Sequence, residues 1–187
     1  MKIIEKWRKY WRIARADEIV RRYFTLNSFD GVLTTIGLLA GMFVAGVTDG
    51  KVITTAAVST GIAIGLSGFW GAFLSETAER KKKLRELEKS LMRKLENTEI
   101  SRASVFASRI IAIVDGASPL LASLVVVSPF FFTPVSQAYY YSFALSGAAL
   151  LALGAFLGSV SGEDKTSYAL KMLLAGVLAA GVSFLLL

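Results

Sequence analysis

The sequence predicts an all-α integral membrane protein with five transmembrane helices. The chain has 187 residues, of which 54% are hydrophobic. Its 21 basic and 14 acidic residues gather in three short regions, and only four charged residues lie elsewhere. Five long apolar stretches remain between the charged regions, and this arrangement is typical of a polytopic membrane protein. The four exceptions are Asp30, Asp49, Lys51 and Asp115.

Each apolar stretch reaches the roughly 20 residues that a helix needs to cross a bilayer. The stretches are continuous rather than alternating, and a spanning segment must satisfy its backbone hydrogen bonds internally, so helices are expected. A charged segment precedes the first stretch, which therefore does not resemble a signal peptide. We expect one transmembrane domain over residues 24–187, with spans at residues 24–47, 52–75, 110–132, 138–161 and 167–187.

The basic residues predict the orientation of these spans. Twenty of the 21 fall on one side of the membrane, and only Lys51, in the turn after the first span, falls on the other. The positive-inside rule then places the N-terminus in the cytoplasm and the C-terminus outside. We expect a multi-pass protein of the cell membrane, with the lipid bilayer as its surroundings and no nucleic-acid partner.

Two segments are expected outside the bilayer. Residues 1–23 carry apolar residues at helical spacing between Lys and Arg, which predicts an amphipathic helix on the anionic inner leaflet. Residues 76–100 predict a cytoplasmic helical extension of the second span with one leucine stripe, which would pack on a partner helix. The apolar residues of the first segment are Ile3, Ile4, Trp7, Tyr10, Trp11 and Ala14, and the stripe is Leu84, Leu87, Leu91 and Leu95.

Asp30 is the leading candidate for a functional residue. It falls within the first span, where a charge costs at least about 2.5–3.5 kcal/mol, so a carboxylate there is a functional candidate by default. Spacings of three and four residues place it on one helix face with other polar or small residues. These are Asn27, Thr34, Gly37 and Gly41. Such a face suits a helix interface or a water-filled path, and the pattern leaves both open.

Three further acidic residues lie in or near the spans. Asp115 falls in the third span, where it either lines a pathway for ions through the membrane or pairs with Arg109. Glu76 and Glu79 follow the second span. These two would form either an ion-binding mouth or a solvated helix end. The glycines of the second span allow close helix packing. They are Gly61, Gly65 and Gly68.

The composition narrows the chemistry of such a site. The chain has no His and no Cys, so a histidine base, a zincin motif and a thiolate metal site are excluded. A carboxylate beside amide and hydroxyl oxygens suits a divalent cation or a proton. The two would compete for one group, which provides a physical basis for exchange of metal for protons. No enzyme activity and no resident cofactor are expected.

Several motifs resemble the vacuolar iron transporter family, in particular its short archaeal-type members without the extended cytosolic metal-binding domain. They are RRYFTLNSFDGVLTTIGLLAGMFVAG, AIGLSGFWGAFLSETAER, the GASP step of the third span and SGEDKTSYALKMLLAGVLAAGVSFLLL. The resemblance implies a homodimer that exports Fe²⁺ or Mn²⁺ from the cytosol in exchange for protons. It also implies an ion path between subunits, lined by the first two spans, with Asp30 in that path.

The sequence leaves three functions open. The first is proton-coupled transport of a divalent metal, with Asp30 as central ligand, Asn27 and Thr34 as neutral ligands, and Glu76 and Glu79 at the cytoplasmic mouth. The second is transport of another cargo, because the family's span-two pattern of Ser-Met and Gly-Glu is replaced here by Ala63-Ile64 and Ser67-Gly68. The third is a scaffold that recruits partners through residues 76–100.

Overall fold

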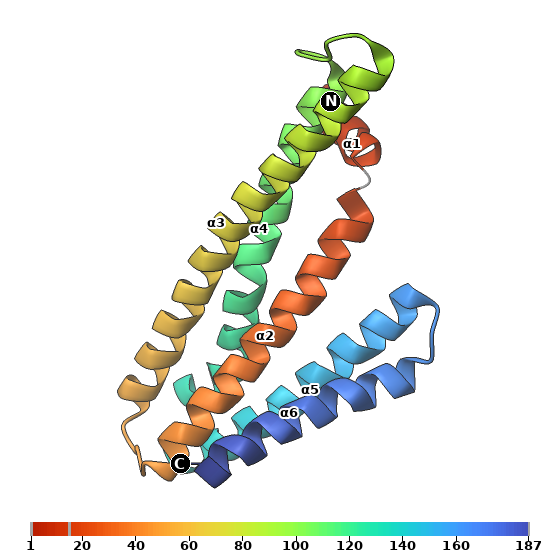
Figure 1. Ribbon diagram of the computed structural model, residues 1–187. Helices are drawn as coiled ribbons and strands as arrows, with labels where there is room; N and C mark the ends of the chain where they lie inside the picture. Colours follow the sequence, from red (N-terminus) through yellow and green to blue (C-terminus); the bar gives the residue numbers. More distant parts are fainter. Residues whose placement is uncertain (1, 15, 187) are drawn as a thin grey trace. The chain divides into compact units, whose positions relative to one another are not determined.

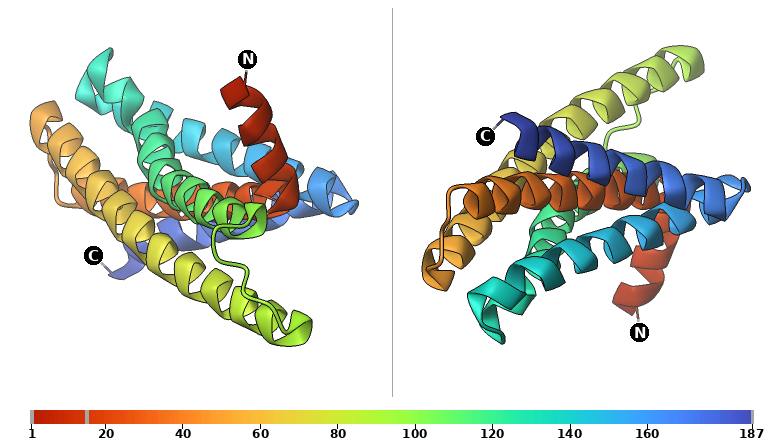
Figure 2. Two further views of the ribbon diagram at one scale, coloured as in Figure 1. Left: turned by 90° about the horizontal axis from the view of Figure 1, so that it is seen from above. Right: turned by 90° about the horizontal axis from the view of Figure 1, so that it is seen from below.

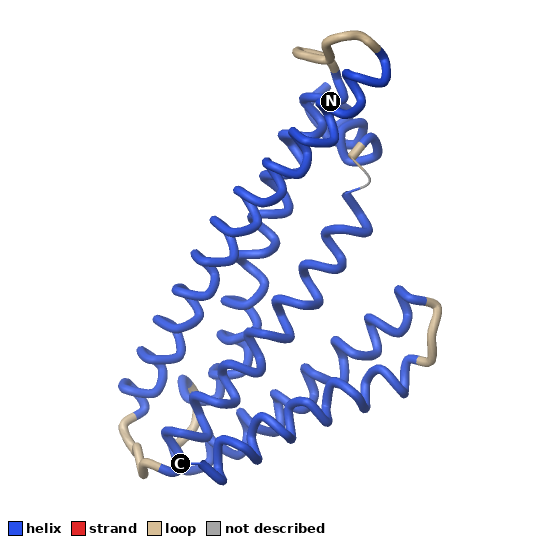
Figure 3. The backbone as a smooth tube through the Cα atoms, viewed as in Figure 1, coloured by secondary structure: helices blue, strands red, loops and turns tan. Residues whose placement is uncertain are grey.

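The structure is a computed structural model that describes residues 2–14 and 16–186, and helices joined by loops are the only regular secondary structure of these residues (Figures 1 and 3). Five helical segments of this part of the chain are long and apolar enough to cross a membrane. The predicted all-α fold with five spans is therefore confirmed. The elements are α1 (Lys2–Ile13), α2 (Ala16–Val44), α3 (Gly50–Leu91), α4 (Glu99–Val127), the 3₁₀ helix η1 (Ser128–Phe131), α5 (Val135–Ser161) and α6 (Lys165–Leu186).

The helices extend beyond the predicted spans, chiefly at the basic ends. Helix α2 begins at Ala16, α3 ends at Leu91 and α4 begins at Glu99. Hydropathy marks only the part of a helix in contact with hydrocarbon, whereas the backbone hydrogen bonds of a helix continue past the membrane surface. The charged ends of these three helices are therefore continuous with their spans.

Neither of the two segments predicted outside the bilayer forms one continuous helix in the structure. Residues 1–23 do not form one helix, because α1 ends at Ile13 and α2 begins at Ala16 with acidic residues in its first turn, where they favour a helix start. The extension over residues 76–100 is helical only as far as Leu91. The chain then turns through Met92 and Asn97, whose φ angles of 47° and 63° are left-handed, before α4 begins.

The chain forms two compact units, and α2, α3 and α4 each contribute to both. The first unit contains the described residues of 1–24 and 66–117, and the second contains those of 25–65 and 118–187. The two units are considered separately below. Asp30 belongs to the second unit, whereas Glu76, Glu79 and Asp115 belong to the first.

The first unit is held together by small buried side chains on α3 and α4. Ala72, Ala107, Ile111 and Ala112 are buried and are covered by residues from the ends of α1 and α2 and by Phe69 and Phe73. Helix α1 packs on the start of α4, because the ring of Phe106 lies 5.7 Å from that of Trp7 and 6.0 Å from that of Tyr10. An ion pair between Lys9 and Glu99 joins the same two helices. The side chains of Ile3 and Ile4 lie outside the described residues.

The second unit has a larger apolar core, and α2 approaches α4 closely within it. A Cβ on Gly31 would lie 2.5 Å from the carbonyl oxygen of Pro119, so no other residue fits there without a shift of the helices. Helices α5 and α6 contact each other and come together toward the loop that joins them (Figure 2), with Gly154 of α5 against the backbone of Tyr168. The buried core comprises Val32, Ile36, Leu39, Ile53, Ala57, Val126, Val127, Phe130, Ala138, Tyr139 and Leu150.

Short polar connections fix the ends of the helices in this second unit. The hydroxyl of Tyr139 donates a hydrogen bond to the carbonyl of Val47 at 2.9 Å, which ties the start of α5 to the turn after α2. Asp164 caps α6 by accepting hydrogen bonds from the backbone N–H groups of Ser167 and Thr166. These bonds stabilise the carboxylate and hold the pKa of Asp164 below its ordinary value.

Candidate functional site

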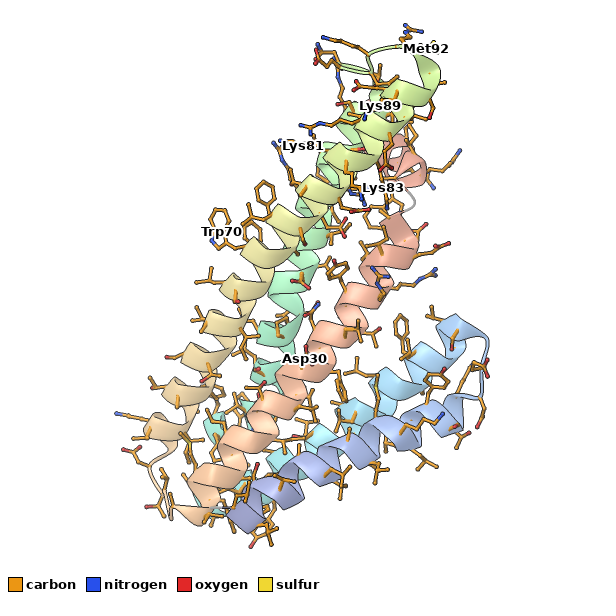
Figure 4. All side chains as sticks on the ribbon, in the orientation of Figure 1. Asp30, Trp70, Lys81, Lys83, Lys89 and Met92 are labelled. Carbon is orange, nitrogen blue, oxygen red and sulfur yellow. The ribbon has the colours of Figure 1, made fainter. Side chains whose placement is uncertain are left out.

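Asp30 lies near the middle of α2 (Figure 4), and its side chain is exposed on the single chain. In the part of the chain that the structure describes, no hydrogen bond or ion pair reaches its carboxylate. The next residue, Gly31, lies against Pro119, and its carbonyl accepts hydrogen bonds from Thr35 at 2.8 Å and Ser123 at 3.3 Å. The backbone beside Asp30 is thus firmly held, while the carboxylate itself is accessible.

The predicted neighbours of Asp30 share its helix but differ in surroundings. Asn27 is half-buried and already interacts with another described residue. Thr34 is also half-buried, and no described residue hydrogen-bonds its hydroxyl. Gly37 lies close to α6, since a Cβ there would be 3.7 Å from the Ser183 hydroxyl. One end of the predicted polar face is therefore a helix contact, and the end near Asp30 is open.

Glu76 is held by two partners in the first unit. The Tyr23 hydroxyl donates to Oε1 at 3.1 Å, and Nε of Arg80 donates to Oε2 at 3.2 Å. The side chains of Arg80 and Glu76 are only 13% and 14% exposed, so this ion pair is largely shielded from solvent. Glu76 is thus a neutralised carboxylate at a helix contact, and it must leave these partners before it can bind an ion.

Glu79 lies one turn from Lys83, and the two form an exposed ion pair with a separation of 3.4 Å between Oε1 and Nζ. Such exposed i,i+4 pairs stabilise a helix by only about 0.3–0.5 kcal/mol. Glu79 is therefore available to solvent and to an approaching cation. Glu76 and Glu79 are both at the basic end of α3, but only Glu79 is exposed there.

Asp115 is buried on α4, with 6% of the residue exposed. A Cβ on Gly68 of α3 would lie 2.9 Å from its Oδ2, so the carboxylate occupies the space that the missing side chain of Gly68 leaves. Asp115 interacts with another described residue, but this residue is not Arg109, which is exposed and has no ion pair in the described part. The alternative of an Asp115–Arg109 pair is therefore wrong.

The predicted packing glycines serve contacts between α3 and α4 in both units. Gly68 adjoins Asp115 in the first unit, and a Cβ on Gly61 would lie 3.2 Å from Leu120 in the second. Gly65 is buried between them along the helix. Among the described residues, no three acidic side chains gather closely enough to hold a metal ion by themselves.

Two residues of this region were not singled out from the sequence. Arg80 could have been found from its spacing, because Glu76 and Arg80 are four residues apart on one helix. Tyr23 could not, because it is 53 residues from Glu76 and nothing in the local pattern links them.

Two comparisons with known proteins found sequences similar to this chain. The profile of the VIT family matches residues 21–109 and 92–187. The chain is also 34% identical over 164 residues to the uncharacterized protein MJ0645 of Methanocaldococcus jannaschii, covering 86% of this chain and 84% of that protein.

The matches run across almost the whole chain and include all five apolar helices. The family consists of membrane transporters, generally for iron and other metals, rather than enzymes. The resemblance noted from the motifs is therefore confirmed, and the chain is a multi-pass membrane protein that belongs to the VIT family.

Proposed function

We propose that this protein transports divalent metal cations, Fe²⁺ or Mn²⁺, and exports them from the cytosol in exchange for protons. The observation that carries the proposal is the exposed carboxylate of Asp30 in a membrane-spanning helix, without an ion pair in the described part of the chain. A charge at this depth is costly unless an ion, water or a polar surface covers it. A transported cation supplies the missing opposite charge.

The oxygen chemistry around Asp30 suits such a cargo. Carboxylate, amide and hydroxyl oxygens are hard ligands, and Asn27 and Thr34 share the helix face of Asp30. Metal binding requires a deprotonated carboxylate, so a proton that binds Asp30 displaces the metal. On the side of the membrane opposite the cytosol, this competition couples the release of the metal ion from Asp30 to the uptake of a proton by Asp30.

A second copy of the chain completes the site in this proposal. The described residues of one chain contain no cluster of three acidic side chains, so one protomer offers Asp30 with neutral oxygens only. Two copies of α2 facing each other would supply two carboxylates and cover both from lipid. The resemblance to the family also implies a homodimer with its path between subunits, and we place this dimer in the cell membrane.

The remaining acidic residues define the approach to the path. The basic ends of α3 and α4 face the cytosol by the positive-inside rule, so Glu79 meets a cytosolic cation first. The cation then binds Glu76, whose carboxylate releases Arg80 and pairs with the cation instead. Asp115 offers a carboxylate beside Gly68, at the position where the family pattern has a Glu, so the acidic group is retained there but supplied by α4.

The test is transport by purified protein in proteoliposomes that contain a metal-sensitive dye and a pH-sensitive dye. A proton gradient is expected to drive Fe²⁺ or Mn²⁺ transport by the wild-type protein, and Asp30→Asn is expected to lower both the metal flux and the proton flux strongly. Thr133→Val, outside the site and in the turn before α5, is the control. Metal flux that is unchanged in Asp30→Asn would contradict the proposal.

A scaffold role is the alternative with an observation in its favour. Leu87 and Leu91 are 38% and 55% exposed near the end of α3, so two members of the leucine stripe are accessible to a partner helix. Leu84 is half-buried and Leu95 is buried in the turn after α3, where its N–H donates to Oε1 of Glu88 at 2.7 Å. Replacing Leu87 and Leu91 with Gln should release associated proteins if the scaffold role is correct and leave metal flux unchanged if it is not.

A further inference from the structure

A cavity of about 240 Å³ lies between α3 and α4 at their basic ends, within the first unit. No residue proposed for the ion path lines it. Its wall combines three cationic side chains, four hydroxyl groups and three apolar side chains. These are Arg80, Lys81 and Arg109, then Thr77, Ser101, Ser104 and Ser108, and finally Phe73, Leu84 and Val105.

The cavity carries excess positive charge. Arg80 is paired with Glu76, but Lys81 and Arg109 are exposed and make no ion pair in the described part of the chain. Among the described residues that line the cavity, none is acidic. Two cations from different helices therefore face a common space, and an anion placed there would interact with both.

The hydroxyl groups add hydrogen-bond donors to this charge. The hydroxyls of Thr77, Ser101 and Ser104 donate to no described residue, although serine and threonine in helices commonly bond the carbonyl one turn earlier. Free hydroxyls beside guanidinium and ammonium groups match the several acceptor oxygens of a phosphate group. The polar half of the cavity is therefore suited to a phosphate.

The other half of the cavity points to a lipid as the source of that phosphate. Phe73 and Val105 form an apolar wall where the uncharged parts of α3 and α4 end. Trp70, one turn before Phe73, is 57% exposed and projects outward from α3 (Figure 4). Exposed Trp side chains concentrate at the headgroup level of membranes. A soluble phosphate would leave the apolar wall uncovered, whereas an acyl chain would cover it.

We propose that this cavity binds the phosphate headgroup of an anionic phospholipid, with an acyl chain along Phe73 and Val105. Basic pockets between membrane helices on the cytoplasmic side commonly hold anionic headgroups. The bound lipid would join α3 to α4 at the level of the inner leaflet. This proposal does not depend on which cargo the protein transports.

The test is native mass spectrometry of the full-length protein, delipidated in detergent and then titrated with phosphatidylglycerol or phosphatidylcholine. We expect saturable binding of a single phosphatidylglycerol per protomer, weakened by salt, and no such site for phosphatidylcholine. Lys81→Gln and Arg109→Gln should each weaken binding about fivefold, since a basic residue near the headgroup contributes about that factor. Arg109→Lys should restore it.

Lys82→Gln is the matched control, because Lys82 is the exposed neighbour of Lys81 and does not line the cavity. It should leave the affinity unchanged within about twofold, whereas a loss equal to that of Lys81→Gln would show only general surface charge and overturn the proposal. Equal binding of the two lipids would also overturn it. Displacement of the lipid by millimolar glycerol phosphate would also overturn it, because the cavity would then bind a soluble anion. A further contradicting result would be a changed oligomeric state, without loss of lipid, in Lys81→Gln and Arg109→Gln, because a second copy of the chain would then cover the cavity.

Discussion

Asp30 and Glu76 are carboxylates on α2 and α3, which follow each other in the chain, but they differ in whether they have hydrogen-bonding and ion-pair partners. Asp30 lies in the apolar part of α2 and has no hydrogen bond or ion pair in the described residues. Glu76 lies at the charged end of α3 and is bound by Tyr23 and Arg80. The more expensive position thus holds the unpaired carboxylate. This difference supports the proposal that Asp30 binds a partner from outside the chain, and it shows that Glu76 takes part in a contact within the fold.

The largest expected effect comes from removing the charge of Asp30. Asp30→Asn should lower metal flux by about 10- to 100-fold, the loss that follows when one charged ligand is removed. The thermal stability of the protein in detergent should not fall, because no internal bond is lost and a costly charge is removed. Flux in proteoliposomes checks the expected loss of transport, and the melting temperature checks the expected stability. A large loss of stability would show that Asp30 has a structural role.

The comparison of Asp30 with Glu76 assumes that the backbone of α2 beside Asp30 is held firmly in place. A substitution of Gly31 tests this assumption. Gly31→Leu should lower the free energy of unfolding by about 3 kcal/mol or more, because the side chain would collide with the backbone of Pro119. Unfolding in mixed micelles measures the change. Gly71→Ala is the control, since a Cβ there meets nothing within 4 Å and alanine is the better helix former. Equal losses in the two variants would contradict the close contact.

Removing the charge of Glu76 should lower the stability of the fold, which Asp30→Asn should not do. Glu76→Gln leaves the largely buried Arg80 without its counter-charge and should lower the free energy of unfolding by about 1–2 kcal/mol. Glu79→Gln breaks an exposed pair and should cost no more than about 0.5 kcal/mol. Chemical unfolding of the two variants side by side gives the difference. If Glu79→Gln were the more destabilising, the assignment of Glu76 to the fold would fail.

The smallest effect is expected at Asp164, an exposed carboxylate with a structural partner. Its pKa is lowered in the folded state from the ordinary value of 3.8, so its contribution to stability is complete above that value. The contribution is lost as the pH falls through the lower folded-state pKa. Asp164→Ala should therefore lower the melting temperature slightly at neutral pH, and the difference from wild type should vanish in strong acid.

Asp164→Asn separates the cap from the charge, because an amide oxygen still accepts the hydrogen bonds of Ser167 and Thr166 but does not titrate near pH 4. Its melting temperature should lie between those of wild type and Asp164→Ala at neutral pH. A difference between wild type and Asp164→Ala that stays constant from neutral pH to strong acid would mean that the carboxylate is not the stabilising group.

Local sequence patterns were enough to predict an all-helical membrane protein with five spans and to single out Asp30 as an unusual charge. These conclusions need only local information, since hydropathy and helical spacing depend on residues close together in the chain. The family could also be recognised, because its motifs are short and continuous. The boundaries at Ala16, Leu91 and Glu99 could not, because a helix that leaves the membrane loses its hydropathy signal without ending.

Which charged side chains have partners could be learned from the packing of the helices alone. The bond from Tyr23 to Glu76 joins residues 53 positions apart, and the space that Gly68 leaves for Asp115 depends on how α3 and α4 pack. Spacing along the sequence suggested Arg109 for Asp115, but the orientation of α4 leaves Arg109 exposed and turned to the cavity beside Lys81. Partner choice follows from the rotation and separation of helices, and these depend on the summed packing of many side chains rather than on any local pattern.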